Sequence, residues 1–390
     1  MSTYSPSQIT FVRRDIWSLE TSNIWDPVTL AYARAVREMQ ARPATDPTSW
    51  AWQAAMHGTY DSPPRGALWN QCQHASWFFL PWHRMYLYWF EQIVRAAVVQ
   101  QGGPPDWALP YWNYSKGFPS NTLPPAFRQP TMPDGSPNAL FVAQRNPLPP
   151  PGINGGAQLP PRATSHAIAD NVINFSPPPS PGFGGGRSSA MQFENATGAL
   201  ENQPHNIIHG LVGGASRPLC GGGLMSDPMC AARDPIFWLH HANIDHLWSH
   251  WIAMGGGRAD PTDNAWLTQQ FTFYGPDGNT VTMACQEVRD TVGQLDYRYD
   301  DEAPLVARRP TVPAQQLTAA RGSAADHELL GASDGGTQLG GRATTLTVTL
   351  PRESRAALAR AADDDHDPSR LRLDIEGVEV DEDPGVVYEV

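Results

Sequence analysis

Several histidines in the second half of the chain have the spacing of metal ligands. His205 and His209 are four residues apart in PHNIIHG, so one face of a helix carries both imidazoles. His240 and His241 follow in DPIFWLHHANIDHLW. Adjacent helical residues point about 100° apart, so we expect one of the two to face the first pair. This block therefore predicts three imidazoles meeting at one point.

A second group of histidines lies upstream. His57 occurs in MHGTY, and His74 and His83 bracket the sequence SWFFLPW. Nine residues advance a helix by about half a turn net, so His74 is expected on the loop before a helix and His83 inside it. An aromatic residue precedes both His83 and His241 by four positions, which favours two equivalent half-sites.

These two groups indicate the kind of metal. Imidazole ligands without carboxylates suit copper or zinc better than magnesium or calcium. The Glu-x-x-His pairs of di-iron bundles do not occur in these blocks. Three histidines also hold catalytic zinc. Two such sets in one domain instead suggest two metal ions about 3.5–4 Å apart with a small ligand between them.

Helices must position these ligands. Residues 1–115 are rich in aromatics and mostly helical in pattern, with helices expected at Asp26–Ala41 and within Trp77–Gln100. Asp26 suits an N-cap, and Pro27 suits the first helical position. Pro81 belongs in a first turn, so the second helix should begin close to it.

The rest of the chain divides by composition. Residues 116–190, rich in Pro and Gly, are expected to be loop, and 191–254 form a second helical block interrupted at 213–223. Irregular strands are expected over 264–299. The sequence predicts a catalytic domain at 1–300, a linker at 301–342 and a partial β segment at 343–390, which includes the alternating TTLTVTL.

Composition limits the classes of function. The chain has 390 residues, of which 41% are hydrophobic and 17% charged, so a buried core is expected. A net charge of −12 argues against nucleic acid or an anionic membrane as the partner. No membrane-spanning apolar run and no secretory signal are visible, which favours the cytoplasm, with export alongside a partner protein left open. Four cysteines are too few for a disulfide scaffold.

Four segments together resemble the type-3 copper proteins, which are tyrosinases, catechol (polyphenol) oxidases and hemocyanins. The segments are HASWFFLPWHR, LPYWNY, ENQPHNIIH and DPIFWLHHANIDHLW. The resemblance covers about residues 1–300, and DNAWL, LDYRY and LRLDIEGVEVDEDP are similar to plant-type polyphenol oxidases. It implies a mainly α fold in which a central antiparallel four-helix bundle holds a dinuclear copper site, with long loops and a small C-terminal β segment.

The resemblance also implies the ligands. Copper A would be held by His57, His74 and His83, and copper B by His205, His209 and His241. The choice of His241 over its neighbour rests on the family pattern. Two copper ions are the implied cofactors, and O₂ is the implied co-substrate.

The same likeness assigns a role to a cysteine. In many family members the cysteine of a Cys-x-His pair, here Cys72 and His74, forms a thioether with the histidine. The alternative is that Cys72 is only a small hydrophobic residue packed in the core. Three cysteines then remain, and Cys220–Cys230 across the Gly-rich turn is the pairing we expect.

Residues around the ligands complete the expected site. Glu201 and Asn206 resemble a pair that orients a water for deprotonating a phenol, with helix capping and solvent exposure as the plainer alternatives. Phe237 is expected to pack on the copper B imidazoles, and Asp245 to brace one of them. Met229 and Ala231 are expected at the mouth of the pocket. Finally, Arg13 or Arg14 should stack on Tyr297 or Tyr299.

The implied activity is the oxidation of phenols by O₂, both o-hydroxylation of monophenols and oxidation of o-diphenols to o-quinones. A strict catechol oxidase, an o-aminophenol oxidase and a hemocyanin-like oxygen-binding protein remain open, and a zinc hydrolase is remote. Small phenols are the expected partners, and a homo-oligomer and a copper-delivery protein are left open.

Overall fold

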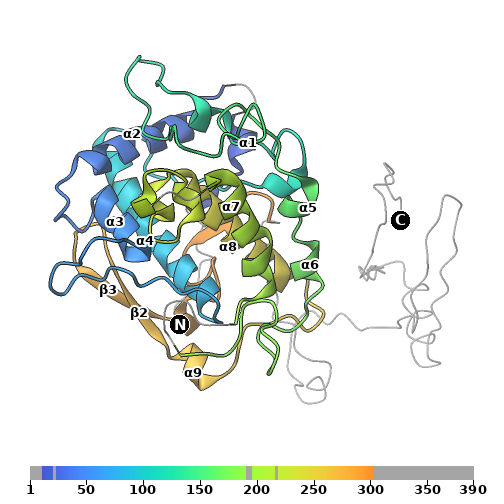
Figure 1. Ribbon diagram of the computed structural model, residues 1–390. Helices are drawn as coiled ribbons and strands as arrows, with labels where there is room; N and C mark the ends of the chain where they lie inside the picture. The colour runs from blue at the N-terminus through green and yellow to red at the C-terminus, as the bar shows by residue number, and fades with distance from the viewer. Residues whose placement is uncertain (1–10, 21–22, 190–195, 216–217, 303–390) are drawn as a thin grey trace, which may run out of the picture. The chain divides into compact units, whose positions relative to one another are not determined.

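The computed structural model describes residues 11–20, 23–189, 196–215 and 218–302 (Figure 1). Both helices expected in the first block are present. Helix α2 spans Pro27–Ala41, and the side chain of its N-cap Asp26 accepts a hydrogen bond from the Val28 N–H. Helix α4 spans Phe79–Gln100, which places Pro81 in its first turn as predicted.

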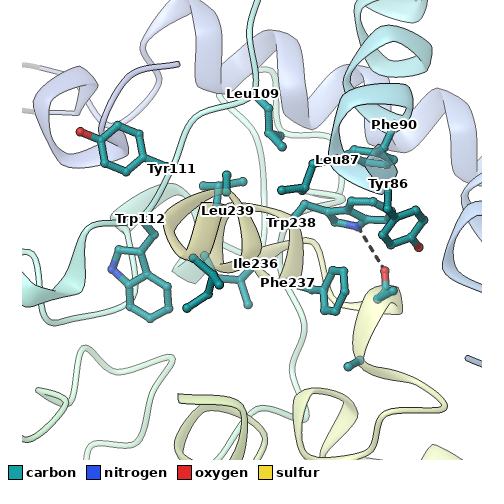
Figure 2. Close-up of a cluster of buried hydrophobic side chains, with 14 of the residues drawn as sticks. Tyr86, Leu87, Phe90, Leu109, Tyr111, Trp112, Ile236, Phe237, Trp238 and Leu239 are labelled. Carbon is teal, nitrogen blue, oxygen red and sulfur yellow. Dashed lines mark hydrogen bonds between the residues drawn. The ribbon is translucent and has the colours of Figure 1, made fainter. Parts of the chain in front are cut away.

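Helix α8 (Ile236–Ala253) lies at the centre of the described core and packs against α4. Its residues are buried on nearly every side, as expected for a helix without a polar face. Figure 2 shows Trp238 of α8 between aromatic and aliphatic side chains, with its indole N–H donating to the Ala232 carbonyl at 3.2 Å. The Phe90 ring of α4 stacks on this indole.

Two shorter helices end near α4 and α8. Helix α3 spans Trp50–His57 and begins at Ser49, whose side chain accepts from the Trp52 N–H. Helix α7 spans Ile207–Gly213 and follows a π-helical turn, η3 (Glu201–Asn206). It stops at Gly214, whose φ of 74° is in the region that favours glycine.

Strands are few and short. Strand β1 (Phe11–Arg13) pairs in parallel with β4 (Tyr297–Tyr299), so the beginning and the end of the described core are joined. Strands β2 (Gln270–Tyr274) and β3 (Thr280–Ala284) form an antiparallel hairpin. Strands β2, β3 and β4 fall in the segment expected to hold irregular strands, whereas β1 lies outside it and was not expected.

The long Pro- and Gly-rich segment contains only short elements, in agreement with the sequence. These and the remaining single-turn elements are α1 (Ile16–Leu19), η1 (Tyr114–Lys116), η2 (Pro125–Arg128), α5 (Pro161–Thr164), α6 (Ala167–Asp170), η4 (Pro218–Cys220), η5 (Leu224–Ser226), η6 (Ala231–Arg233), α9 (Asn264–Leu267) and η7 (Cys285–Val288). Among the described helices, none has the length and apolar composition needed to cross a bilayer. The predicted β segment at 343–390, and the linker before it except for its first two residues, lie outside the described residues.

Candidate metal centre

The six predicted ligands come from different elements and meet in the core. His57 is the last residue of α3, His74 lies on the loop before α4, and His83 lies in α4. The other three are His205 at the end of η3, His209 in α7 and His241 in α8. The expected division between loop and helix for His74 and His83 is confirmed.

Within the first set, the ring centroids of His57 and His74 are 5.1 Å apart, and those of His74 and His83 are 5.2 Å apart. The His57 and His83 centroids are 5.6 Å apart. Each ring therefore neighbours the other two, as three ligands around one centre require.

The second set is equally close. The His205 ring lies 4.5 Å from that of His209 and 4.9 Å from that of His241, centroid to centroid. The two sets also touch, because His83 and His241 stack with centroids 4.4 Å apart and planes inclined by 10°. The six imidazoles thus form one continuous cluster, in which the ligand atoms of His57, His83 and His241 also lie within 4.8 Å of one another across the two predicted sets.

Hydrogen bonds fix which ring nitrogen is available. The Nδ1 atoms of His57, His83 and His209 lie 2.9, 2.8 and 2.7 Å from the carbonyl oxygens of Pro228, Phe79 and Met225. A carbonyl oxygen only accepts, so each ring donates its Nδ1–H and keeps a lone pair on Nε2. His205 makes the equivalent bond to Oδ1 of Asn206 at 2.9 Å.

The Nε2 atoms have the surroundings of metal ligands. Among the described residues, the buried Nε2 atoms of His83 and His205 have no hydrogen-bond partner. The Nε2 atoms of His209 and His241 face each other at 3.3 Å. Buried polar atoms are rarely left without a partner, so this arrangement fits metal ions held between the rings.

The electrostatics keep the rings neutral. Burial lowers the pKa of His57 to about 3 and that of His209 to about 4. Burial, followed by the neighbouring imidazoles, also holds the pKa of His83 and His205 well below the ordinary value. Neutral imidazoles bind metals, so the set does not have to lose protons near pH 7.

An aromatic layer surrounds the imidazoles. Phe237 lies 4.2 Å from His241 and 5.9 Å from His209, ring to ring, which confirms its predicted place on the second set. Phe79 has the corresponding position, 4.7 Å from both His83 and His205. The repeated aromatic–histidine spacing in the sequence therefore corresponds to two packing residues of the site.

His240 is a further member of the cluster and was not among the expected ligands. Its buried ring lies 4.8 Å from that of His209 and 5.3 Å from that of His205. The Tyr114 hydroxyl is 3.2 Å from its Nδ1. The His-His doublet is the signal in the sequence that could have suggested a fourth imidazole here.

Cysteines occupy two positions near the site. Cys72 is fully buried, and its sulfur lies within 4.8 Å of a ring nitrogen of both His57 and His74. The expected disulfide between Cys220 and Cys230 is present, which confirms that pairing.

Glu201 and Asn206 take different positions. Glu201 is buried, and both carboxylate oxygens accept from the N–H of Ala75, at 2.8 and 2.9 Å, directly after His74. Burial raises the pKa of Glu201 to about 8. Asn206 is exposed beside His205. The carboxylate therefore fixes the loop that carries His74, and the amide fixes the His205 ring.

Asp245 requires a correction. Its carboxylate forms ion pairs with Arg13 and Arg84 and accepts from the Tyr297 and Tyr299 hydroxyls. Among the described residues, none of its hydrogen bonds reaches His241. Two buried guanidinium groups attract the carboxylate more strongly than a neutral imidazole does.

The predicted stacking at this network is confirmed. The Arg13 guanidinium carbon lies 3.8 Å above the Tyr297 ring centroid. This contact joins strands β1 and β4 beside Asp245, in the middle of α8.

Met229 and Ala231, which were expected at the mouth of the substrate pocket, differ in exposure. Ala231 is fully buried, whereas Met229 is partly exposed, so of the pair only Met229 reaches the described surface. Met229 directly follows Pro228, whose carbonyl accepts from His57.

Known proteins are similar to this chain in sequence and in fold. The family model "common central domain of tyrosinase" matches residues 47–254, which include all six imidazoles. The model "polyphenol oxidase middle domain" matches residues 260–311. A tyrosinase of Hahella sp. (strain CCB-MM4), HcTyr1, is 37% identical over 360 residues, which is 85% of this chain and 71% of that protein.

Plant proteins are similar as well. The latent chloroplastic polyphenol oxidase of Prunus armeniaca is 31% identical over 74% of this chain, and the match spans 49%, about half, of its length. The crystal structure of Grenache (Vitis vinifera) polyphenol oxidase superposes with a TM-score of 0.59 at 30% identity, covering 78% of this chain and 89% of that one. Latent apple tyrosinase gives 0.60 at 27% identity, covering 81% and 68%. With its histidine cluster and these likenesses, the chain belongs to the tyrosinase and polyphenol oxidase family of copper oxidoreductases.

Proposed function

We propose that the chain oxidises phenols with O₂, hydroxylating monophenols at the ortho position and converting o-diphenols to o-quinones. The observation that carries this proposal is the cluster of six neutral imidazoles, in which the buried Nε2 atoms of His83 and His205 have no hydrogen-bond partner among the described residues. The name of the bacterial relative, a tyrosinase, supports the inclusion of monophenols.

His57, His74 and His83 would hold one copper ion, and His205, His209 and His241 the other. When bound, copper supplies the two-electron redox chemistry with O₂ that phenol oxidation needs. The chain supplies orientation, because the Nδ1 hydrogen bonds prevent the rings from turning. The Phe79 and Phe237 rings exclude water from the inner side of the cluster.

Asn206 and Glu201 are our candidates for handling the substrate proton. An unperturbed phenol has a pKa near 10, so a monophenol needs a base at neutral pH. Asn206 is exposed next to His205, where an incoming phenol reaches it. Glu201 is the buried carboxylate four residues before this histidine. We propose that the two residues together orient a water that accepts the phenol proton.

Asn206→Gly tests this pair. It should slow the oxidation of a monophenol more than that of a catechol, because the lost hydrogen bond to His205 affects both substrates whereas the water serves only the monophenol. Initial rates with tyrosine and 4-tert-butylcatechol give the comparison. Equal losses on the two substrates would contradict the role.

Oxygen consumption by the copper-loaded chain tests the activity as a whole. We expect about two copper ions per chain and O₂ uptake with both monophenols and catechols, with a lag on monophenols that a trace of catechol removes. His83→Ala is the matched inactive control. Binding of O₂ without quinone formation would indicate an oxygen carrier, uptake with catechols alone a strict catechol oxidase, and zinc in place of copper a different enzyme.

We also propose the Cys72–His74 thioether. The buried sulfur and the His74 ring lie close enough for this bond after modest movement. Peptide mapping should find the two residues in one cross-linked peptide that has lost two hydrogen atoms. Separate, unmodified peptides would show that Cys72 is only a packing residue.

For the fold we propose that the histidine-bearing helices act as an antiparallel four-helix bundle. The contact between α4 and α8, which carry His83 and His241, supports it. An experimental structure with copper bound would test the helix directions.

A further inference from the structure

We propose that residues 224–230, here called the carbonyl segment, orient one imidazole of each copper set at the same time, and that the Cys220–Cys230 disulfide holds this segment in place. The inference rests on the proposed function, because it concerns retention of the copper pair. It makes the Cys220–Cys230 bond a control point for both metal ions.

Two carbonyl groups of this segment serve different sets. The Met225 carbonyl accepts from Nδ1 of His209 at 2.7 Å, and the Pro228 carbonyl accepts from Nδ1 of His57 at 2.9 Å. His57 belongs to the first set and His209 to the second. A shift of this single segment therefore removes one orienting hydrogen bond from each metal ion. Losing such a partner typically weakens metal binding about 10–100-fold.

The carbonyl segment has little regular secondary structure of its own, and its contacts with α7 include the Ser226 hydroxyl, which donates to the Gly214 carbonyl at 2.6 Å. It consists of the one-turn helix η5 and the residues after it, and three glycines, 221–223, precede it. One-turn helices are marginal without a tertiary constraint. Leu219 and Cys220, at the start of the disulfide loop, have φ angles of 51° and 58°, which non-glycine residues adopt only when their surroundings enforce it. The disulfide supplies that constraint across a separation of ten residues.

Asp227 and Tyr60 make a second attachment. The Asp227 carboxylate accepts from the Met229 N–H at 3.0 Å and from the Tyr60 hydroxyl at 3.0 Å. Asp227 thus positions the residue next to the Pro228 carbonyl. On the other side, Gly58 packs so closely that an added Cβ would lie 2.5 Å from this carbonyl oxygen. The carbonyl segment and the C-terminal end of α3 therefore pack in direct contact, with no room for a side chain at Gly58.

Reduction of the Cys220–Cys230 disulfide should release the carbonyl segment. A phosphine adds two electrons, taken up with two protons, to the sulfur atoms of Cys220 and Cys230, and leaves as the phosphine oxide with an oxygen atom from water. The two thiols then no longer constrain the segment. Disulfides persist in oxidising compartments and are reduced in the cytoplasm, so copper retention would depend on the compartment.

The test measures copper release from the full chain. Copper-loaded wild type and the Cys220→Ser/Cys230→Ser variant are mixed with excess EDTA. Samples are desalted at intervals to remove the copper–EDTA complex, and the copper that stays on the protein is measured by atomic absorption and by electron paramagnetic resonance. We expect the variant to lose copper at least about tenfold faster. Both ions should leave in step, so that a mononuclear Cu(II) signal stays small. An unchanged half-time, or loss of one ion with a full mononuclear signal, would overturn the proposal.

Two further variants support the interpretation. Cys285→Ser removes another buried cysteine that lies outside the segment, and it should keep the wild-type half-time. Tyr60→Phe removes a single hydroxyl from an exposed side chain and should speed release about twofold to tenfold, the factor for one net hydrogen bond. If the double variant does not fold, Tyr60→Phe and the phosphine-reduced wild type decide the question, and wild-type rates in both would reject the proposal.

Failure of the proposed function gives a different result. A wild type that does not bind two copper ions or oxidise 4-tert-butylcatechol refutes that function. A fully active wild type whose variants release copper at the wild-type rate refutes only the role of the carbonyl segment.

Discussion

Asp245→Asn should destabilise the copper-free protein strongly, although the residue binds no metal. Its side chain is 3% exposed, and it pairs with Arg84 and Arg13, which are 2% and 0% exposed. Arg13 keeps a second carboxylate, Glu91, at 2.7 Å. Among the described residues, no other carboxylate lies within ion-pair distance of Arg84, so the substitution leaves this buried guanidinium with only the more distant carboxyl groups of Asp260 and Glu302. Breaking such a pair costs about 3–5 kcal/mol of the free energy of unfolding.

Urea unfolding of the copper-free chain, followed by tryptophan fluorescence and far-UV circular dichroism, measures this cost without the contribution of metal binding. Asp263→Asn is the matched control, because its ion pair with Arg187 is 32% and 45% exposed and should be worth about 0–1 kcal/mol. A cost for Asp245→Asn no larger than that of the control would refute the reasoning.

The pH dependence provides a second check. Burial opposes ionisation of Asp245, but Arg84 and Arg13 hold the pKa of its carboxyl below the ordinary value of 3.8. A lowered pKa in the folded state stabilises the fold above the ordinary pKa, and this contribution is lost as the pH falls through the folded value. The gap between wild type and variant should therefore be full at neutral pH and shrink below about pH 3.8. A gap that stays constant into acid would show that the ionised carboxylate is not its source.

Three other outcomes are expected. The copper-free protein should lose stability as the pH falls below about 6.5. The folded state holds the pKa values of His57 and His209 at about 3 and 4, so these residues take up protons only when the chain unfolds. A urea midpoint that is unchanged between about pH 7.5 and 5 would contradict this. Phe237→Ala should cost about 3–5 kcal/mol in the same assay, and Phe237→Leu clearly less; equal costs would mean that the ring is not packed as described. His241→Ala should bind one copper fewer per chain by atomic absorption, while His240→Ala keeps the wild-type content; the reverse order would assign the ligand to His240.

Local rules were sufficient for the helices that carry the site. An aspartate followed by proline marks the start of α2, and a proline in the first turn marks that of α4, because these residues satisfy or do not need the free N–H groups of a helix end. The i, i+4 spacing of His205 and His209 similarly placed two rings together.

The hydrogen-bond and ion-pair partners of these side chains could not be predicted from the sequence. The carbonyl groups of Phe79, Met225 and Pro228 orient three imidazoles, but every residue has a carbonyl, so no residue type signals them. Asp245 lies one helical turn from His241, yet its carboxylate pairs with Arg13, 232 residues away. Spacing along a helix says nothing about such a distant competitor.

The pairing of β1 with β4 has a consequence for biosynthesis. Arg13 emerges early from the ribosome, but its partner Tyr299 is made 286 residues later. At about 5–20 residues per second, the nascent chain waits roughly 15–60 s before this charged side chain can be enclosed. The core therefore cannot close until synthesis has passed Tyr299, and a chain released before Tyr297 leaves the guanidinium without its aromatic cover.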